Sequence, residues 1–226
     1  MRAEHGLPPD PELQMPDRHL VLVPFPPSYR APESPLPATA HAFCPLVPLP
    51  AQPGDTPTVC FSLGTEFNLE SGDLFARVLA GLRRLPLDVI ATVGRDFDPT
   101  ELGPQPGSIR VERYVPQAEI LPRASVVVSH GGSGSILGAL AHGLPMVLLP
   151  MGADQPYNAE RCQALGVART LDLIGATSDG VRDAVAAVLS DPAYRVNAER
   201  WRDEFAALPG PEHAVALLEE LGQPSP

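Results

Sequence analysis

The chain has 226 residues, 44% of them apolar and 19% charged, a composition typical of a soluble globular protein of one or two domains. Its net charge of -11 disfavours binding to nucleic-acid phosphates, and no apolar run is long enough for a membrane span or an N-terminal secretory signal. Three scattered cysteines, Cys44, Cys60 and Cys162, argue against a disulfide framework or a zinc site and fit a reducing cytoplasm.

Prolines divide the chain near residue 57. Residues 1–57 hold 15 of the 29 prolines. This part contains two short strand candidates, 19–23 and 40–44, joined by a Pro-rich stretch typical of extended surface polypeptide. Two short strands cannot bury a core alone. Residues 1–57 are therefore predicted to be the edge or wrap of another domain, ending in a semi-rigid linker over 45–57.

From residue 58 the sequence alternates between short apolar runs and amphipathic segments. The runs predict strands at 58–62, 88–93, 109–112, 125–129, 146–149 and 167–170. The other segments predict helices at 71–84, after Pro116, and at 133–142, 154–164, 177–189, 192–208 and 211–221. This alternation predicts an α/β fold with a Rossmann-like, doubly wound parallel sheet over residues 58–226, preceded by the Pro-rich extension.

Ligands of such sheets bind beyond the carboxyl ends of the strands. The loop after the fourth strand, residues 129–135, reads SHGGSGS. Its glycines let backbone N–H groups converge, and the helix that follows adds partial positive charge, so the loop predicts a phosphate or pyrophosphate site. His130 can donate a charge-assisted hydrogen bond there. The structural alternative is a tight turn whose glycines serve only packing.

The glycine spacing excludes other nucleotide-binding motifs. The loop after the first strand, Ser62-Leu-Gly-Thr65, lacks GxGxxG, and the fourth-strand loop also misses that spacing, which disfavours nicotinamide or flavin binding. The chain contains no lysine, so a GxxxxGK[ST] loop cannot occur.

Four motifs in order resemble the donor-binding half of GT-B glycosyltransferases, most closely the bacterial macrolide and antibiotic glycosyltransferases of family 1. They are YVPQ at 114–117, ASVVVSHGGSGS at 124–135, GLP at 143–145 and GADQPYNA at 152–159, and the SLGT loop at 62–65 also matches. The resemblance covers residues 58–221. Residues 1–57 resemble the end of the family's N-terminal, acceptor-binding domain with its linker.

The resemblance implies a binding site for a nucleoside-diphosphate sugar. His130 and the backbone amides of residues 132–134 would hold the pyrophosphate, and residues 64 and 65 would touch phosphate or sugar. The whole set implied is Gly64, Thr65, Val115, Gln117, His130, Gly131, Gly132, Ser133, Gly134, Asp154 and Gln155.

The same resemblance implies roles at the two ends of the ligand. Val115 would meet the base through its backbone, with Gln117 near the nucleoside, and Asp154 and Gln155 would hydrogen-bond hydroxyls of the donor hexose. Asp154 and Gln155 also begin a helix at the same carboxyl edge as His130, where their polar groups suit a polyhydroxylated ring.

Each of these residues has a structural alternative. Asp154 could be only an N-cap, Gln155 an exposed helix residue, and Gln117 a residue that satisfies its own turn. Tyr114 is expected to be packed rather than stacked on a base. The remaining conspicuous side chains are expected to be structural: His142 at a helix end, and Cys162, Trp201 and Phe205 in the core.

Family members transfer a sugar with inversion, by direct displacement at the anomeric carbon, without a required metal or cofactor. Their general base is a histidine of the N-terminal domain, most of which this chain lacks, so no catalytic residue is expected here. The resemblance implies a dTDP- or UDP-hexose donor and a small-molecule acceptor such as a natural product. Three interpretations stay open: the donor domain of a longer enzyme, a half-enzyme needing a separate acceptor-binding subunit, and a non-catalytic nucleotide-sugar-binding remnant. A sugar-nucleotide epimerase is a more distant option.

Overall fold

The computed structural model describes residues 3–11, 14–46, 48–64 and 71–222. The chain forms two compact units, residues 1–47 with 205–226, and residues 48–204. A single division near residue 57 is expected from the prolines, whereas here the last 22 residues belong with the N-terminal segment. No helix in the described ranges is long and apolar enough to cross a membrane.

The larger unit is built on a six-stranded parallel sheet in the order β5-β4-β3-β6-β7-β8. All six predicted strands are present, with ends within a residue of those expected: β3 (Thr58–Ser62), β4 (Asp88–Thr92), β5 (Ile109–Glu112), β6 (Val126–Ser129), β7 (Met146–Leu148) and β8 (Ala168–Thr170). The strand order reverses between β3 and β6. This is the order of Rossmann-like sheets, in which the crevice at the reversal binds ligands.

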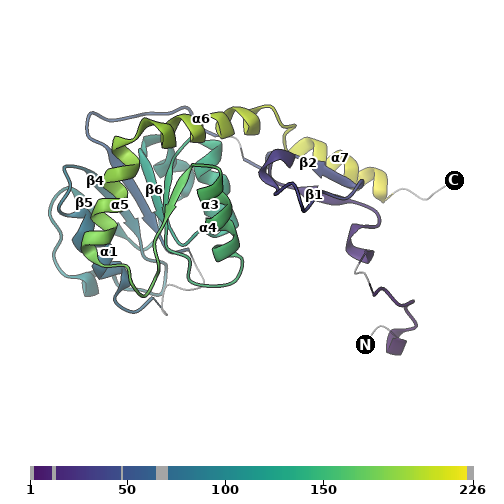
Figure 1. Cartoon of the computed structure of the whole chain (residues 1–226), viewed down its shortest axis with the longest axis horizontal. Coiled ribbons are helices and arrows are strands. Elements are labelled where there is room, and N and C mark those ends of the chain that lie inside the picture. The colour runs from purple at the N-terminus through teal and green to yellow at the C-terminus, as the bar shows by residue number, and fades with distance from the viewer. Residues whose placement is uncertain (1–2, 12–13, 47, 65–70, 223–226) are drawn as a thin grey trace. The chain divides into compact units, whose positions relative to one another are not determined.

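Helices cover both faces of this sheet (Figure 1). Helices α1 and α5 pack together on one face and share a core with residues 59, 61 and 63 of the β3 region. Helices α3 and α4 lie on the other face. The helices of this unit are α1 (Leu74–Leu82), α2 (Gln117–Ile120), α3 (Ser133–Ala141), α4 (Gln155–Ala164), α5 (Ser178–Ser190) and α6 (Pro192–Ala206), the last of which ends in the smaller unit.

Two local details differ from the sequence prediction. Helix α1 begins at Leu74 rather than at residue 71, because Gly72 takes a left-handed conformation with φ +56° that a helix cannot include. It ends at Leu82 rather than at residue 84, and Arg83 is its C-cap. A short 3-10 helix, η4 (Pro99–Leu102), was not predicted; the carboxylate of Asp98 caps it by accepting from the N–H of Thr100 at 3.0 Å.

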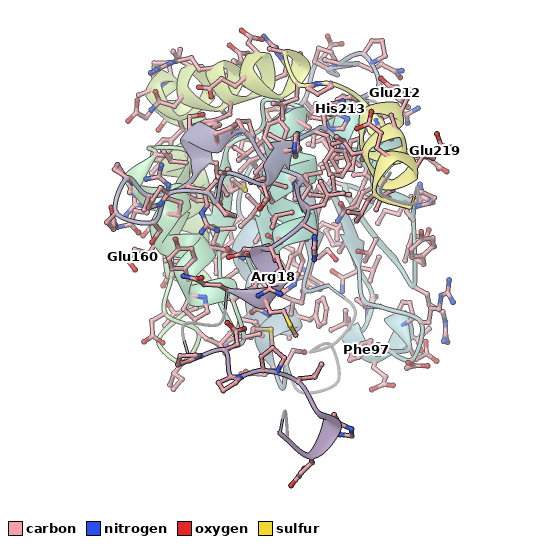
Figure 2. All side chains as sticks on the ribbon, turned by 90° about the vertical axis from the view of Figure 1, so that its right-hand side faces the viewer. Arg18, Phe97, Glu160, Glu212, His213 and Glu219 are labelled. Carbon is pink, nitrogen blue, oxygen red and sulfur yellow. The ribbon has the colours of Figure 1, made fainter. Side chains whose placement is uncertain are left out.

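The smaller unit pairs β1 (Val21–Val23) with β2 (Ala40–Ala42) in parallel, and it includes α7 (Pro211–Leu221). The Phe25 ring stacks on Tyr29 with centroids 4.6 Å apart and meets the edge of Phe205 at 5.8 Å. The rings of His41 of β2 and His213 of α7 are tilted, with centroids 6.1 Å apart. Figure 2 labels His213 on α7. The segment after β1 and strand β2 thus each contact a residue of the C-terminal part of the chain.

Several side chains lie where the sequence analysis expects structural roles. His142 is the C-cap of α3, Trp201 is 7% exposed and Phe205 is 1% exposed. Cys44, Cys60 and Cys162 are buried, and no disulfide joins them within the described residues. Burial raises the pKa of the Cys60 thiol to about 12. These cysteines are therefore small apolar core residues.

Candidate functional site

The two strands at the reversal point end in the same local turn. Ser62 ends β3 and Ser129 ends β6, and these two residues are paired in register. Each serine hydroxyl accepts a hydrogen bond at 3.3 Å from the N–H two residues on, that of Gly64 and that of Gly131. Both glycines have positive φ, +80° and +83°, which only glycine adopts without strain. The turns place residue 63 and residue 130 at equivalent positions.

The imidazole of His130 lies between two glycines from these loops. A Cβ added at Gly64 would lie 2.6 Å from its Cε1, and one added at Gly132 would lie 2.5 Å from its Nε2. Neither glycine can therefore carry a side chain without displacing the ring. This close approach explains why both loops are glycine-rich beyond the needs of the turns themselves.

The surroundings of His130 favour a neutral ring. Burial lowers the pKa of His130, and the nearby carboxylate of Asp154 opposes that shift. Its Nδ1 is buried and has no hydrogen-bond partner within the described part of the chain. A neutral ring with its proton on Nε2 buries only a lone pair and keeps a donor. An anion beside the ring would favour the protonated form.

The N-terminus of α3 adjoins His130. Gly132 is the N-cap and no side chain caps this end. The first N–H groups of an α-helix have no acceptor within the helix, and together with the helix dipole they form a site for an anion. His130 and these amides therefore combine donors of two kinds at one place.

A hydrogen-bonded cluster joins this loop to α4. Oδ2 of Asp154 accepts from the hydroxyl of Ser133 at 2.8 Å and from Nδ2 of Asn158 at 2.8 Å. These two bonds are the main causes that lower the pKa of Asp154, with a smaller contribution from His130. Asp154 stands at the N-cap position of α4, but its side chain makes no capping bond. The simple N-cap alternative is thus wrong.

Gln155 is 3% exposed, so the exposed-helix alternative is also wrong. Its Oε1 accepts from the backbone N–H of Met151 at 2.7 Å and of Gly152 at 3.2 Å. Only the Nε2 donor of its side chain remains for a ligand. Between these residues, Ala153 has φ +53°, an uncommon conformation for a residue with a side chain.

These groups surround one cavity of about 430 Å³ at the carboxyl edge of β3 and β6. It brings together eight of the eleven residues implied by the resemblance: Gly64, Gln117, His130, Gly132, Ser133, Gly134, Asp154 and Gln155. Gly131 shapes the turn behind them without lining the cavity. Thr65 lies outside the described residues.

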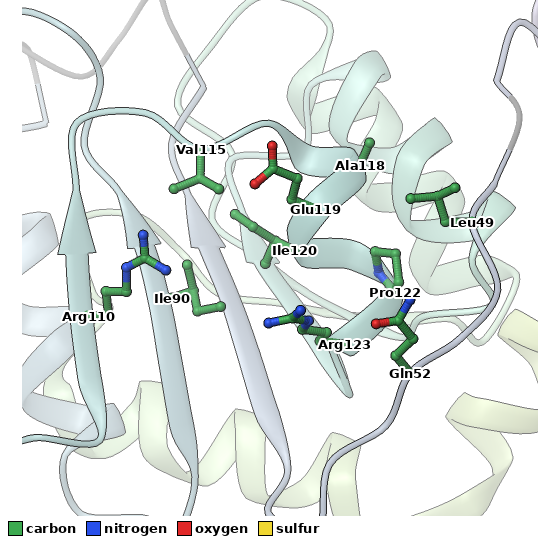
Figure 3. A pocket seen from close by; sticks show the side chains of 10 residues that line it. All are labelled: Leu49, Gln52, Ile90, Arg110, Val115, Ala118, Glu119, Ile120, Pro122 and Arg123. Atoms are coloured by element: carbon green, nitrogen blue, oxygen red, sulfur yellow. The ribbon is translucent and has the colours of Figure 1, made fainter.

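Val115 does not line this cavity. It lines a second cavity of about 250 Å³ with Ile90 of β4, Arg110 of β5 and residues of α2 (Figure 3). Gln117, two residues later, is exposed and does reach the first cavity, where its Oε1 lies near Gly138 of α3. The residues around YVPQ therefore divide between the two cavities.

The expectation that Tyr114 is packed is wrong. Its side chain is 61% exposed, and the guanidinium carbon of Arg95 lies 5.6 Å from its ring centroid. A cation over an aromatic face gives a modest attraction, but the exposed ring buries little apolar surface. This position is compatible with contact to a ligand or another part of a longer protein.

Sequence reasoning missed three residues of the site. Ser135 and Ala153 line the first cavity, and Asn158, 8% exposed, lies behind it, hydrogen-bonded to the lining residues Ser133 and Asp154. The helical spacing of Asn158 from Asp154, four residues, was a usable signal because such pairs face each other. In the described ranges, no group of three or more His, Cys, Asp or Glu side chains is placed to hold a metal ion.

Comparisons with known proteins identify the family. Residues 76–221 match the model "Erythromycin biosynthesis protein CIII-like, C-terminal domain". The chain is 35% identical over 150 residues to 3-alpha-mycarosylerythronolide B desosaminyl transferase of Saccharopolyspora erythraea, covering 66% of this chain and 33% of that protein. It is 33% identical over 207 residues to 4'-demethylrebeccamycin synthase of Lentzea aerocolonigenes, covering 86% of this chain and 48% of that protein.

Solved structures of glycosyltransferases have a similar fold. The calicheamicin glycosyltransferase CalG4 has a TM-score of 0.81 at 28% identity, covering 92% of this chain and 53% of that one. The spinosyn rhamnosyltransferase SpnG, complexed with thymidine diphosphate, has a TM-score of 0.79 at 26% identity, covering 96% of this chain and 60% of that one.

The chain spans between a third and half of the length of these curated relatives, and somewhat more than half of these solved structures. The part of the family that it matches is the C-terminal one, as its order of motifs, its Rossmann-like sheet and the matching family model all indicate. The chain belongs to the erythromycin biosynthesis protein CIII-like C-terminal domain family, the donor half of family 1 GT-B glycosyltransferases related to the macrolide and antibiotic enzymes.

Proposed function

We propose that this chain binds a nucleoside-diphosphate hexose as the donor half of an inverting glycosyltransferase whose acceptor is a small molecule. The observation that carries the proposal is the cavity at the β3–β6 reversal point, where His130 and the start of α3 lie on one side and Asp154 and Gln155 on the other. We assign the first side to the anion and the second to the hydroxyls. A nucleotide sugar needs both, because its diphosphate and its hexose are joined at the anomeric carbon.

The anion-binding side would stabilise the leaving group. When the anomeric bond breaks, negative charge grows on the diphosphate oxygen that leaves with the nucleotide. The N–H groups of residues 132–134 and Nε2 of His130 are donors held in place before the reaction, and such donors lower the barrier by stabilising charge as it develops. Because burial lowers the pKa of His130, the ring is neutral before the reaction and donates through Nε2 to the developing charge.

The hydroxyl-binding side would orient the sugar. Oδ2 of Asp154 is already bonded to Ser133 and Asn158, so Oδ1 is the oxygen available to accept from a sugar hydroxyl. The side-chain Nε2 of Gln155 can donate to a sugar oxygen while its Oε1 braces residues 151 and 152. Fixing the ring in this way aligns the anomeric carbon with the leaving diphosphate.

The nucleoside would extend towards residues 114–117. Gln117 reaches the cavity from α2, and the backbone of Val115 is two residues away along the chain. Thymidine is the preferred base in this proposal. The solved structure of SpnG is described as a complex with thymidine diphosphate, and that of VinC as a complex with dTDP.

The general base and the acceptor site would come from another domain or subunit. A further SpnG structure is described as a complex with spinosyn aglycone, which supports a small-molecule acceptor. This chain spans only part of its relatives, so transfer by inversion, without a metal or cofactor, is proposed for the complete enzyme and donor binding for this chain. In this proposal, residues 58–226 form the donor domain, and residues 1–57 are a remnant of the acceptor domain with its linker.

Calorimetric titration of the chain with dTDP and UDP tests the proposal. Saturable binding is expected, tighter for dTDP, and His130→Ala should weaken it about tenfold or more because a hydrogen bond to a charged group is lost. The matched control is His142→Ala, which removes a histidine from the other end of α3, where Nδ1 lies 2.8 Å from the carbonyl oxygen of Gly138. No binding by a folded chain, or equal loss in both variants, would contradict the proposal.

Adding an acceptor-binding half in trans separates the remaining interpretations. Sugar transfer from a bound donor to an aglycone would support a donor domain or a two-subunit enzyme. Donor binding without transfer, with an acceptor half that is active beside its own donor domain, would support a non-catalytic remnant.

A further inference from the structure

Asn158 is a buried polar residue at the centre of the site that donor contacts do not account for. It lies in the first turns of α4 and is 8% exposed. Its Nδ2 lies 2.8 Å from Oδ2 of Asp154, 3.1 Å from the carbonyl oxygen of Gly131 and 3.3 Å from Oγ of Ser133. One amide group therefore joins the turn after β6 and the start of α3 to Asp154 at the start of α4.

The hydrogens around this amide can be assigned without ambiguity. The carbonyl of Gly131 and the carboxylate of Asp154 can only accept, so the amide nitrogen, rather than its oxygen, faces them. The hydroxyl of Ser133 gives its single hydrogen to Asp154, which leaves its lone pairs for Asn158. The three partners are thus satisfied by two amide hydrogens, one of them shared.

This arrangement fixes the direction in which Asp154 presents its charge. Two side-chain donors hold Oδ2, whereas no other residue's side chain holds Oδ1 within the described part of the chain. The carboxylate cannot rotate without breaking both bonds. At the same time, the bond to Gly131 ties the carbonyl of the glycine turn to α4.

A purely structural brace would look different, and the chain contains one. Nδ2 of Asn197 donates to the carbonyl of Gly166 at 3.1 Å, again an amide bonded to a glycine of positive φ. Gly166 follows the C-terminal end of α4, away from the cavity. No carboxylate takes part there within the described residues, so Asn197 joins two segments and orients no charge.

We propose that Asn158 is a positioning residue for donor recognition: it orients the Asp154 carboxylate and ties it to the glycine turn, so that Oδ1 meets the donor sugar while the α3 amides meet the diphosphate. This inference rests on the proposed function, and it adds a residue that acts through Asp154 rather than on the ligand.

The first test needs no ligand. The pKa of the Asp154 carboxyl is followed by carbon-detected NMR in the full chain, in Asn158→Ala and in Asn197→Ala. Asn158→Ala should raise the pKa of Asp154 because a hydrogen bond to the ionised form is lost, and Asn197→Ala should leave it unchanged. An unchanged pKa of Asp154 in a folded Asn158→Ala variant would overturn the inference.

The second test compares binding of the diphosphate alone with binding of the whole nucleotide sugar. The affinities for a nucleoside diphosphate and for the corresponding nucleotide sugar are measured by calorimetry in the same three proteins. Asn158→Ala should weaken sugar-nucleotide binding about tenfold and diphosphate binding only about two- to threefold, because the hydrogen bond at stake serves the sugar end. Equal losses for both ligands would indicate general damage and contradict a positioning role.

The pH dependence of sugar-nucleotide affinity in Asn158→Asp distinguishes a positioning role from a purely structural one. It replaces the donor with a second carboxylate beside Asp154, and two such groups share a proton as the pH falls. Sugar-nucleotide affinity, relative to the unmodified chain at each pH, should recover between pH 7.5 and about 5.5 in this variant and stay low in Asn158→Ala. Absence of that recovery would also count against the inference.

The outcomes separate the two proposals. If the unmodified chain binds neither ligand although the pKa of Asp154 responds to Asn158, the proposed function fails while the geometric role of Asn158 stands. If the chain binds the donor and Asn158→Ala changes neither quantity, the positioning role fails while the proposed function stands.

Discussion

The turns at residues 62–64 and 129–131 share a backbone but differ in what they carry. Both follow neighbouring strands, both are closed by a serine hydroxyl, and both end in a glycine of positive φ. The middle residue of the first is Leu63, which is fully buried, and that of the second is His130, which lines the cavity. The two turns therefore have the same backbone conformation, and the middle side chain determines whether the turn packs into the core or lines the cavity.

The comparison also shows how the two turns depend on each other. Gly64 of the first turn leaves the space that the His130 ring of the second turn occupies. A site at the reversal point of a parallel sheet is thus assembled across two strands that are neighbours in space and 67 residues apart, as the pairing of Ser62 with Ser129 shows. The following predictions test this division of labour, beginning with the largest effect.

Leu63→Ala and His130→Ala should affect opposite properties. Removing a fully buried leucine should lower the free energy of unfolding by about 2–5 kcal/mol. His130→Ala should cost less than about 1 kcal/mol, because the ring is partly exposed and its Nδ1 lacks a partner, but it should abolish most donor affinity. Urea unfolding followed by the fluorescence of Trp201, the single tryptophan, measures the first quantity. Equal losses of stability in Leu63→Ala and His130→Ala would contradict the assignment of Leu63 to the core and His130 to the binding site.

Gly64→Ala and Gly131→Ala should differ although their φ angles are nearly equal. At Gly131 the nearest atom to an added Cβ is 3.5 Å away, so only backbone strain of about 1–2 kcal/mol is expected. At Gly64 the collision with His130 adds overpacking of about 1–3 kcal/mol. The same urea experiment compares the two. In His130→Ala, the extra cost at Gly64 should disappear, and its persistence would show that the ring is not its cause.

Acid should weaken the free fold and tighten donor binding. Because burial lowers the pKa of His130, the folded chain binds fewer protons than the unfolded chain below about pH 6.5, so this group's contribution to stability falls as the pH falls.

A bound diphosphate favours the charged ring of His130, so donor binding takes up a proton. Affinity for a nucleotide sugar, which has no terminal phosphate that titrates near pH 6, should rise by at most about tenfold per pH unit from pH 8 to 6.

His130→Gln is the control for this pH dependence, since glutamine keeps a donor but does not titrate. Calorimetry in buffers of different ionisation enthalpy should detect proton uptake in the unmodified chain only. The same uptake in His130→Gln would assign the proton to another group.

Gly134→Ala should have the smallest effect on stability, in contrast to Gly132→Ala. An added Cβ at Gly134 meets no atom within 4 Å, so alanine in this helical position should stabilise the fold by about 0.4–1 kcal/mol. Gly132 also has an ordinary φ of -65°, but alanine there would displace the His130 ring. Donor affinity should therefore fall in Gly132→Ala, and thermal unfolding should distinguish both variants from the unmodified chain.

Regular structure was predictable because it depends on local pattern. The buried run that became β6 and the glycines after it are adjacent in sequence, so the edge of the sheet where the cavity lies followed from them. The start of α1 was not predictable in the same way, because the left-handed conformation of Gly72 overrides the apolar pattern that begins beside it.

What the sequence could not supply are contacts between distant residues. The burial of Gln155 depends on the N–H groups of residues 151 and 152, and the role of Asn158 depends on the carbonyl of Gly131, 27 residues earlier. Tyr114 is 61% exposed, with the Arg95 guanidinium over its ring, although aromatic side chains are commonly buried. The grouping of residues 205–226 with the N-terminal segment depends on long-range ring contacts such as that of Phe25 with Phe205.

The buried cysteines allow the opening rate of each unit to be measured separately by chemical labelling. Cys44 belongs to the smaller unit, and Cys60 and Cys162 to the larger one. A thiol reacts as its thiolate, and burial holds the pKa of Cys60 at about 12, so a maleimide can label it only after the sheet opens. Mass spectrometry of singly labelled chains then yields one opening rate for each unit, and a bound donor should slow labelling of Cys60 and Cys162 more than that of Cys44.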